Sequence, residues 1–310
     1  TDGEFGNATV DFESSLEFVR DRLSEDKIFI IPGFYGVSKE GRKTIFGRGG
    51  SDYSAAAIAS CIDAEYLDVW KDVDGFQTAD PKLVENPLTI SHLNYGEAAE
   101  LAYFGAKILH PRTVEPLLNK NIPIRIFNIN KTDAKLTPLT IIERQENIRD
   151  EVIKSVTYSD DFCVIRLSGP GVGIKHGLVH KITSQLEEER INIKLIFNTH
   201  THINLFFSSF DIDRAYSIIK DIPLSGINKC IKKTGLSTVA VVGCGMMEKL
   251  GIAARLFSAV AKEGVNIETI NFGASDVVTY FILDQKDRNR AINAIHNEFF
   301  SKLIEQKETI

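Results

Sequence analysis

The sequence predicts an α/β fold in which a mostly parallel sheet, sandwiched by helices, is followed by two smaller α+β units. In residues 1–127, helical patterns alternate with short apolar strands, which is typical of a parallel sheet covered by helices. The second half repeats one unit of strand, helix, strand and strand. The segment 128–150 between the halves is polar and irregular, so we expect three domains, over 1–145, 150–235 and 236–306.

Composition argues against several classes of protein. The chain has 310 residues, 43% hydrophobic and 25% charged, which is typical of a soluble globular protein. A net charge of −6 without a basic stretch argues against nucleic acid as a partner. The four cysteines lie far apart, which indicates reduced thiols in a cytoplasmic protein and no metal site. The sequence has no run of about 18 apolar residues, so we expect no membrane partner.

The elements of the first half follow from its periodicities. Apolar residues at helical spacing predict an amphipathic helix over 9–24. The continuous apolar run 28–31 predicts a strand buried on both faces. The remaining expected elements are a helix after Gly50, a strand over 66–70, helices over 91–104 and from 111 to 119, and a last strand over 122–127.

One glycine-rich stretch organises this half: Phe46-Gly47-Arg48-Gly49-Gly50-Ser51-Asp52. Its glycines permit a tight turn, and Ser51 and Asp52 are residue types that cap the helix behind them. A helix start gathers unpaired N–H groups and the positive end of the helix dipole, to which Arg48 adds a guanidinium. We expect an anion site there, where the glycine-rich loops converge beyond the strand ends. The alternative is an ordinary strand-to-helix turn with a solvated arginine.

The second half contains an internal duplication. Two tripeptides, 177–179 and 191–193, match 251–253 and 265–267, and each pair lies 74 residues apart. In both copies a glycine loop opens the helix and an asparagine turn leads into the next strand, so loop and turn can meet at one edge. Two copies side by side would place pockets at their junction. The alternative is a pair of units that only mediates dimerisation.

Three ordered signatures in the first half resemble those of the aspartate kinase family. Residues 46–52 resemble its substrate loop. Two further segments resemble its nucleotide loop and a third signature, namely Trp70-Lys71-Asp72-Val73-Asp74-Gly75 with Thr78-Ala79-Asp80-Pro81, and Phe104-Gly105-Ala106-Lys107-Ile108-Leu109-His110-Pro111. The duplicated unit is similar to the paired ACT domains, which sense amino acids. The resemblance covers nearly the whole chain and implies a partial amino-acid kinase fold followed by two ferredoxin-like ACT units.

The resemblance implies transfer of the γ-phosphoryl group of ATP, with Mg²⁺, to the side-chain carboxylate of L-aspartate, giving 4-phospho-L-aspartate. A carboxylate with a pKa of about 4 is already ionised at neutral pH, so no base is needed. The expected difficulty is repulsion between two anions, which cations and backbone donors would offset. Such an enzyme belongs to the biosynthesis of lysine, threonine and methionine, under feedback control by an end product.

The same resemblance assigns roles to the loop residues. Arg48 would pair with a carboxylate of aspartate, Asp52 would orient the reacting groups, and the substrate site would be lined by Gly49, Gly50 and Ser51. The alternative for Asp52 is a helix cap alone. The expected ATP-binding residues are Lys71, Asp72, Gln77, Lys82 and Lys107. Gln77 stands where many members have a tyrosine, and Lys82 replaces an arginine, which keeps the charge and loses the bidentate fork.

The effector site is expected at the repeats, at Val172, Lys175, Leu178, Asn192, Lys194, Gly251, Ile252 and Asn266. Lysine-sensing members of the family have acidic groups where this chain has Lys194 and His200, which would repel a second cation. We therefore expect threonine rather than lysine as the regulatory amino acid, with a fused kinase-dehydrogenase as an open alternative for the parent protein. ACT pairs bury their edges against another copy, so we expect a homodimer or a larger assembly.

Two alternatives remain, a non-catalytic amino-acid-sensing subunit and a related kinase acting on glutamate or carbamate. The family also begins with a strand and a Lys-Phe-Gly-Gly phosphate loop, which do not precede Thr1 in this sequence. We therefore expect the chain as given to be an inactive fragment. Steady ADP production from ATP and aspartate by the pure chain would contradict this expectation.

Overall fold

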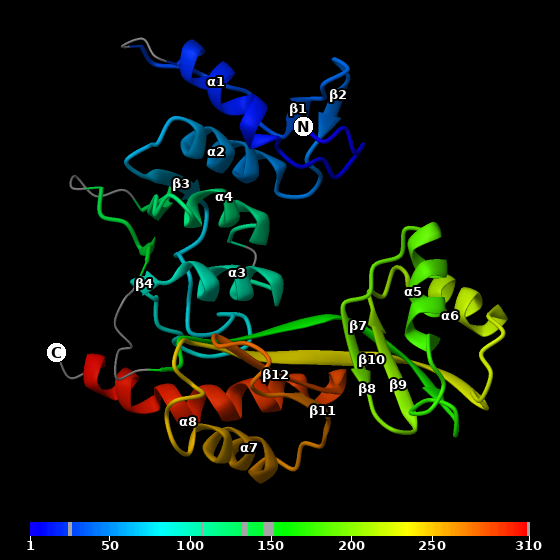
Figure 1. The fold of residues 1–310 in the computed structure, drawn as a ribbon. Coiled ribbons are helices and arrows are strands. Elements are labelled where there is room, and N and C mark those ends of the chain that lie inside the picture. The colour runs from blue at the N-terminus through cyan, green and yellow to red at the C-terminus, as the bar shows by residue number, and fades with distance from the viewer. Residues whose placement is uncertain (24–26, 107, 132–135, 145–151, 309–310) are drawn as a thin grey trace.

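A computed structural model describes residues 1–23, 27–106, 108–131, 136–144 and 152–308 (Figure 1). The first half begins with helix α1 (Phe12–Arg22), the hairpin β1 (Tyr35–Val37) and β2 (Lys43–Ile45), helix α2 (Gly50–Cys61) and strand β3 (Leu67–Lys71). It continues with β4 (His92–Leu93), α3 (Tyr95–Tyr103), the 3-10 turn η1 (Pro111–Thr113), α4 (Glu115–Leu118), β5 (Ile124–Asn128) and β6 (Thr140–Ile142). The prediction of helices alternating with strands is confirmed here.

The sheet of the first half has the strand order β3-β5-β6-β4. Strands β3 and β5 run parallel, as do β4 and β6, and β5 pairs antiparallel with β6. Strand β6 lies inside the segment 128–150, which the sequence predicted to be irregular. That prediction was wrong at residues 140–142, because the polar surroundings hide a three-residue strand whose partners are distant in the sequence.

The apolar run 28–31 also differs from its prediction. It was expected to form a strand buried on both faces, yet it belongs to none of the described strands, and Ile28 and Ile30 are 97% and 95% exposed. An apolar run forms a buried strand only where a neighbouring strand accepts its backbone hydrogen bonds. None of the described strands pairs with this run.

The second half is built on one six-stranded antiparallel sheet, with the order β11-β12-β10-β7-β9-β8. Its first unit contains β7 (Ser155–Ser168), α5 (Leu178–Glu188), β8 (Leu195–Asn198), β9 (His202–Phe207) and α6 (Ile212–Asp221). The second contains β10 (Lys229–Val242), α7 (Ile252–Lys262), β11 (Ile267–Asn271), β12 (Val278–Asp284), the turn η2 (Gln285–Asp287) and α8 (Arg288–Glu308). Both units follow the same order outward from the centre, which confirms the duplication and the predicted fold class.

The two units exchange strand halves along the central pair β7 and β10. Residues 229–233 pair with 164–168, whereas 236–242 pair with 155–162, and the register shifts between them. The boundary expected at 235/236 falls at this shift, where Gly235 has a φ of 71°. Residues 155–162, expected in the first unit, therefore complete the sheet of the second.

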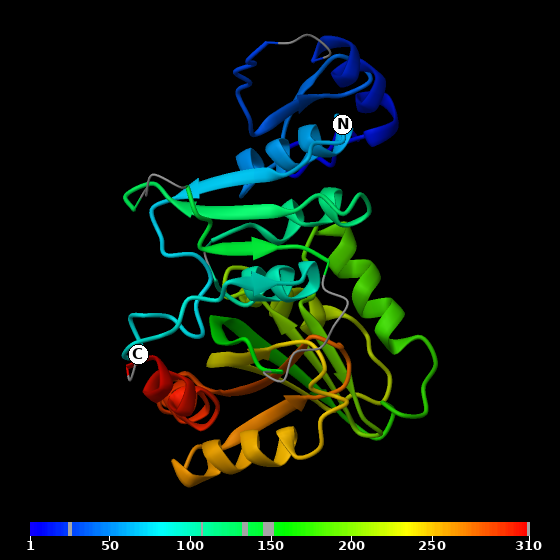
Figure 2. The ribbon, with the colours of Figure 1, turned by 90° about the vertical axis from the view of Figure 1, so that its left-hand side faces the viewer.

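The two faces of the second unit's sheet pack on different layers. Along β10, Ala240 and Val242 join a core shared with the helices of the first half, whereas Val239 and Val241 pack with α7 and α8. This alternation is the two-residue period of a strand. Figures 1 and 2 show α3 on one side of this sheet and α7 and α8 on the other. The two halves of the chain are thus joined by a continuous apolar core.

A buried carboxylate adds a polar link between the halves. Glu97 is 1% exposed and forms a capping box at the start of α3, where Asn94 N–H donates to Glu97 Oε2 at 2.8 Å. Its other oxygen, Oε1, accepts the N–H of Cys244 at 2.9 Å. Cys244 lies in the loop that precedes α7, so this loop is tied to a helix of the first half.

Candidate functional site

The glycine-rich stretch forms a left-handed turn that opens α2. Gly49 is the N-cap, with φ 71° and ψ 14°, and no side chain caps the helix. The prediction that Ser51 and Asp52 cap it was wrong, because the helix begins at Gly50 and both residues lie in its first turn. The first amides of the helix are therefore left without side-chain caps, as an anion-binding helix start requires.

Asp52 pairs with Lys71 instead of capping the helix. The ammonium of Lys71 lies 3.1 Å from Asp52 Oδ1 and 3.0 Å from Oδ2. Lys71 is the last residue of β3, so the ion pair joins the carboxyl end of a parallel strand to the first turn of α2. The structure thus brings together one residue expected at the aspartate site and one expected at the nucleotide.

The segment 32–34, which precedes β1, lies against the same helix start. Phe34 N–H donates to Ser54 Oγ at 2.8 Å, and Ser54 Oγ donates to the carbonyl of Gly50 at 2.7 Å. A Cβ on Gly33 would lie 3.2 Å from Ser51 Cα. This close approach favours glycine, and it brings the two segments together.

Arg48 is exposed, and within the described part of the chain its guanidinium forms no hydrogen bond or ion pair. Phe46, two residues before Arg48, is held by Arg112. The Arg112 guanidinium donates to the Phe46 carbonyl at 3.2 Å and to the Ala8 carbonyl at 2.7 Å. The Arg112 guanidinium also lies over the ring of Tyr53, 4.5 Å from its centroid. The loop is therefore fixed at Phe46 while Arg48 is left free to bind an anion.

Sequence reasoning missed His110 as a site residue, although His110 lies in the third signature segment. A Cβ on Gly49 would come within 2.3 Å of His110 Cβ and 2.5 Å of Cγ, so the imidazole occupies the space beside this glycine. Burial, with the neighbouring charges of Arg112 and Arg48, lowers the pKa of His110. The ring Nδ1 of His110 accepts the backbone N–H of Arg112 at 3.4 Å. This hydrogen bond holds the neutral imidazole against the loop.

The loop 71–84, which contains most of the expected nucleotide-binding segments 70–75 and 78–81, is held at Asp74 and at Gln77. Asp74 accepts hydrogen bonds from Asn128 Nδ2 and Lys131 Nζ, both at 2.7 Å. Further along, the carbonyl of Gln77 accepts from Ser155 Oγ at 2.8 Å. Asp72 and Lys82 are exposed along the loop, and Lys107 lies outside the described residues. No described contact joins Asp72, Gln77 or Lys82 to the Asp52–Lys71 pair.

Several expected effector residues have their side chains inside the cores of the repeats. Leu178 and Val172 are 5% and 6% exposed, and Ile252 is 4% exposed, so only their backbones can line a ligand site. Gly251 is the left-handed N-cap of α7, with φ 83°. Those with exposed side chains are Lys175, Asn192 and Asn266.

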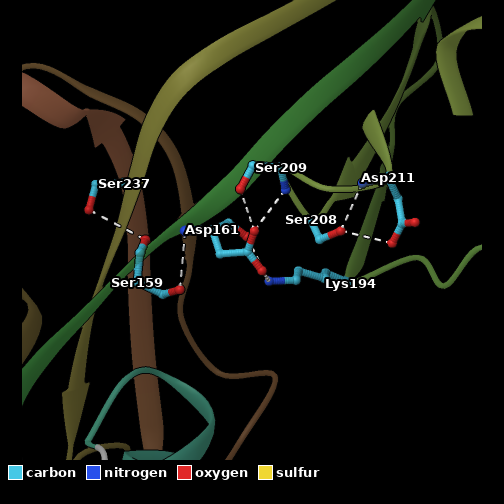
Figure 3. Close-up of polar contacts among 7 residues, drawn as sticks. All are labelled: Ser159, Asp161, Lys194, Ser208, Ser209, Asp211 and Ser237. Atoms are coloured by element: carbon cyan, nitrogen blue, oxygen red, sulfur yellow. Dashed lines mark hydrogen bonds and ion pairs between the residues drawn. The ribbon is translucent and has the colours of Figure 1, made fainter. Parts of the chain in front are cut away.

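Lys194 lies in a polar cluster beside the centre of β7 (Figure 3). Its ammonium is 2.6 Å from both Asp161 Oδ2 and the Asp161 carbonyl, and 4.6 Å from the ring centroid of Phe162. Asp161 Oδ1 accepts from Ser209 N–H and Oγ at 2.7 and 2.5 Å. Burial raises the pKa of Asp161, but the hydrogen bonds from Lys194 and Ser209 outweigh it and the pKa is lowered.

This pairing changes the argument about the effector. The sequence suggested that Lys194 would repel a lysine ligand, but an adjacent carboxylate compensates its charge. Lys194 therefore no longer supports the expected repulsion of a lysine ligand.

Within the ranges that the structure covers, no group of three His, Cys, Asp or Glu side chains is placed to hold a metal ion. Among the helices in these ranges, none combines the length and the apolar composition that crossing a membrane requires.

Comparison with known proteins shows to which class of protein the chain belongs. The Amino acid kinase family matches residues 1–128, and an ACT domain family matches residues 239–299. The aspartokinase of Bacillus sp. (strain MGA3) is 30% identical over 309 residues, which cover 96% of this chain and 72% of that protein. The class is thus an amino-acid kinase domain joined to ACT units. Within it, the chain belongs to the aspartokinase family.

Two further relatives define the extent of the match. The bifunctional aspartokinase/homoserine dehydrogenase of Haemophilus influenzae is 33% identical over 311 residues, 96% of this chain, but the chain spans only 37% of its length. E. coli aspartokinase III, solved with aspartate and ADP in its R-state, matches with a TM-score of 0.81 at 28% identity, over 97% of this chain and 67% of that one. Its T-state complex with lysine and aspartate matches with a TM-score of 0.75 at 27% identity, over the same shares.

Proposed function

We propose that this chain carries the aspartate site and part of the nucleotide site of an aspartate kinase. The reaction is transfer of the γ-phosphoryl group of ATP to the side-chain carboxylate of L-aspartate, giving 4-phospho-L-aspartate and ADP. The observation that carries this proposal is the Asp52–Lys71 ion pair, which joins the start of α2 to the end of β3. The match to an E. coli enzyme solved with aspartate and ADP supports it.

Each part of the helix start has a role in the proposed reaction. The free guanidinium of Arg48 binds a carboxylate of aspartate through its bidentate fork. The N–H of Ser51, which no side chain caps, and the helix dipole stabilise negative charge beside it. Lys71, oriented by Asp52, supplies a cation where two anionic reactants meet. A carboxylate oxygen of aspartate then attacks the γ-phosphorus as the bond to ADP breaks, without a general base.

Mg²⁺ enters this proposal as part of the nucleotide substrate. Asp52, a carboxylate at the helix start, already accepts two hydrogen bonds from Lys71. The described side chains do not converge into a three-ligand cage. The phosphate oxygens of ATP are therefore the main ligands available to a magnesium ion at this site.

We further propose that the repeats, 150–235 and 236–306, bind a regulatory amino acid and that the two units assemble a homodimer or larger form. Threonine remains the favoured effector because His200, which also stands where lysine-sensing members have acidic groups, is exposed at the first repeat. The lysine complex of E. coli aspartokinase III supports an amino-acid ligand for this type of protein. Calorimetric titration of threonine and then lysine, with Asn192→Ala and Asn266→Ala as controls, tests the effector. Binding of an effector without any binding of aspartate or ATP would favour the non-catalytic sensing subunit.

The test of the catalytic proposal uses the natural full-length protein. L-Aspartate is titrated into the wild type and into Arg48→Ala, and phosphoryl transfer is followed in the same samples. We expect aspartate binding and turnover in the wild type and loss of aspartate affinity in the variant. Unchanged aspartate affinity in Arg48→Ala would overturn the assignment of the site.

A further inference from the structure

Helix α8 contacts the loop 71–84 through a pair of buried polar side chains, one from the helix and one from the loop. Thr78 Oγ1 lies 2.9 Å from His296 Nε2, although 218 residues separate them. Thr78 is 5% exposed and His296 is 1% exposed. The contact therefore joins the middle of loop 71–84 to α8 across the boundary between the two halves.

The hydrogen bonds of this pair are not all satisfied. Thr78 Oγ1 accepts the N–H of Leu88 at 2.9 Å, and in one tautomer of His296 its own proton is donated to Nε2. The ring proton then lies on Nδ1, which has no partner in the described chain. In the other tautomer, the Thr78 hydroxyl proton and the Nδ1 lone pair are both left unpaired. Each arrangement costs stability that an apolar pair of similar shape would not cost, so stability alone does not explain these residues.

A second side chain of α8 holds the same loop further along. Asn293 lies three residues before His296, on the same face of the helix, and its Nδ2 donates to the carbonyl of Leu83 at 3.0 Å. The two contacts enclose residues 79–82, which include the exposed Lys82. The start of β7 adds a third support, because Val156 N–H donates to the carbonyl of Thr78 at 2.8 Å.

We propose that His296 and Asn293 are positioning residues for the nucleotide, acting through the loop that α8 holds. They fix the backbone on both sides of Lys82, so that its ammonium is presented to the phosphates of ATP in one place. This inference rests on the proposed function, since it assigns loop 71–84 to ATP. It adds that the affinity for ATP depends on a helix that belongs to the second ACT unit.

The experiment measures KM for ATP, KM for aspartate and kcat in the natural full-length protein. His296→Phe removes the hydrogen bond while it keeps an aromatic ring against Phe300, whose centroid lies 4.8 Å from the imidazole. We expect about a five- to tenfold rise in KM for ATP, with KM for aspartate changed less than about twofold. His296→Gln, which restores a hydrogen-bonding group, should recover most of the affinity. Asn297→Ala, an exposed neighbour on α8, is the matched control and should leave all three constants unchanged.

Further variants keep the inference testable if His296→Phe does not fold. Asn293→Ala removes the contact with Leu83, and Thr78→Val removes the contact with His296 together with the acceptor for the Leu88 N–H. Both should raise KM for ATP in the same selective way. The double variant Thr78→Val/His296→Phe should be no worse than Thr78→Val alone, because both changes remove the same Thr78–His296 interaction. Equal KM values for ATP in the wild type and all these variants would overturn the inference while the proposed function stands. Absence of ATP binding in the wild type would overturn the proposed function and the inference with it.

Discussion

Lys71 and Asp52 form an ion pair in which the ammonium lies 3.0 and 3.1 Å from the two carboxylate oxygens. The two residues come from different elements, the end of β3 and the first turn of α2. Both side chains are only partly exposed, at 29% and 20%. Because of this contact, the segment expected to bind ATP and the segment expected to bind aspartate share one pair of charges.

Removing either member of this pair should reduce kcat. Lys71→Met deletes a cation and leaves Asp52 as an uncompensated anion beside two anionic substrates, so we expect kcat to fall about a hundredfold. Asp52→Asn leaves Lys71 without its orienting partner and should cost about tenfold or more. Steady-state kinetics checks both. Lys39→Met, which removes an ion pair to Asp11 with a 73% exposed lysine, is the control and should leave kcat unchanged.

Arg48→Lys distinguishes the effect of charge from that of geometry at the proposed aspartate site. The lysine keeps a positive charge but loses the bidentate fork, so we expect KM for aspartate to rise about tenfold while KM for ATP changes little. Arg48→Ala should raise it further. A larger effect on ATP than on aspartate in either variant would argue that Arg48 faces the nucleotide.

Gly49→Ala should destabilise the protein through both backbone strain and a steric clash. The φ of 71° costs about 1–2 kcal/mol for a residue with a Cβ, and the new methyl would overlap His110. Gly41→Ala is a matched control, since its φ is 79° and a Cβ there meets nothing within 4 Å. Denaturant unfolding should show a larger loss for Gly49→Ala than for Gly41→Ala. Equal losses would mean that His110 yields to the methyl without cost.

His296 should make stability depend on pH below neutrality. Burial lowers its pKa to about 4, from an ordinary value of 6.5. Above pH 6.5 the ring is neutral in both states, whereas between pH 6.5 and 4 the unfolded chain binds a proton that the folded chain does not. The free energy of unfolding should therefore fall by about 2 kcal/mol between pH 7.5 and 5. In His296→Phe the free energy of unfolding should depend less on pH over this range. An unchanged pH dependence would contradict the conclusion that burial keeps His296 neutral in the folded protein.

The Asp161–Lys194 pair should contribute modestly to the stability of the first unit. Lys194→Met leaves Asp161 without its cation, so we expect a loss of about 1 kcal/mol, limited because the carboxylate is 48% exposed. Lys233→Met, which breaks the ion pair with Glu268, serves as the comparison because it also removes the lysine of one partly exposed pair. Thermal unfolding measures both, and no loss for Lys194→Met would show that solvent already screens the pair.

Local patterns in the sequence were sufficient for the fold class and for the convergence of the loops. The 74-residue repeat and the alternation of helices with strands depend on periodicity, which a single sequence displays. The pairing of Lys71 with Asp52 could not be predicted in detail, although the placement of both loops at strand ends made it compatible with the fold.

The errors and omissions have a common physical cause. The run 28–31 has the composition of a buried strand, but composition does not show whether a partner strand lies beside it. His110, Glu97 and His296 act through contacts with residues far away in the sequence, at Gly49, Cys244 and Thr78. Such contacts depend on how elements pack, which the local pattern does not determine.

The formation of 4-phospho-L-aspartate from ATP and L-aspartate by the natural full-length protein, compared with Arg48→Ala, tests the proposed activity most directly. We expect product with L-aspartate as acceptor, no comparable product with glutamate or carbamate, and a strong loss in the variant at subsaturating aspartate. Transfer to glutamate or carbamate in place of aspartate, or full activity of Arg48→Ala at low aspartate, would contradict this expectation.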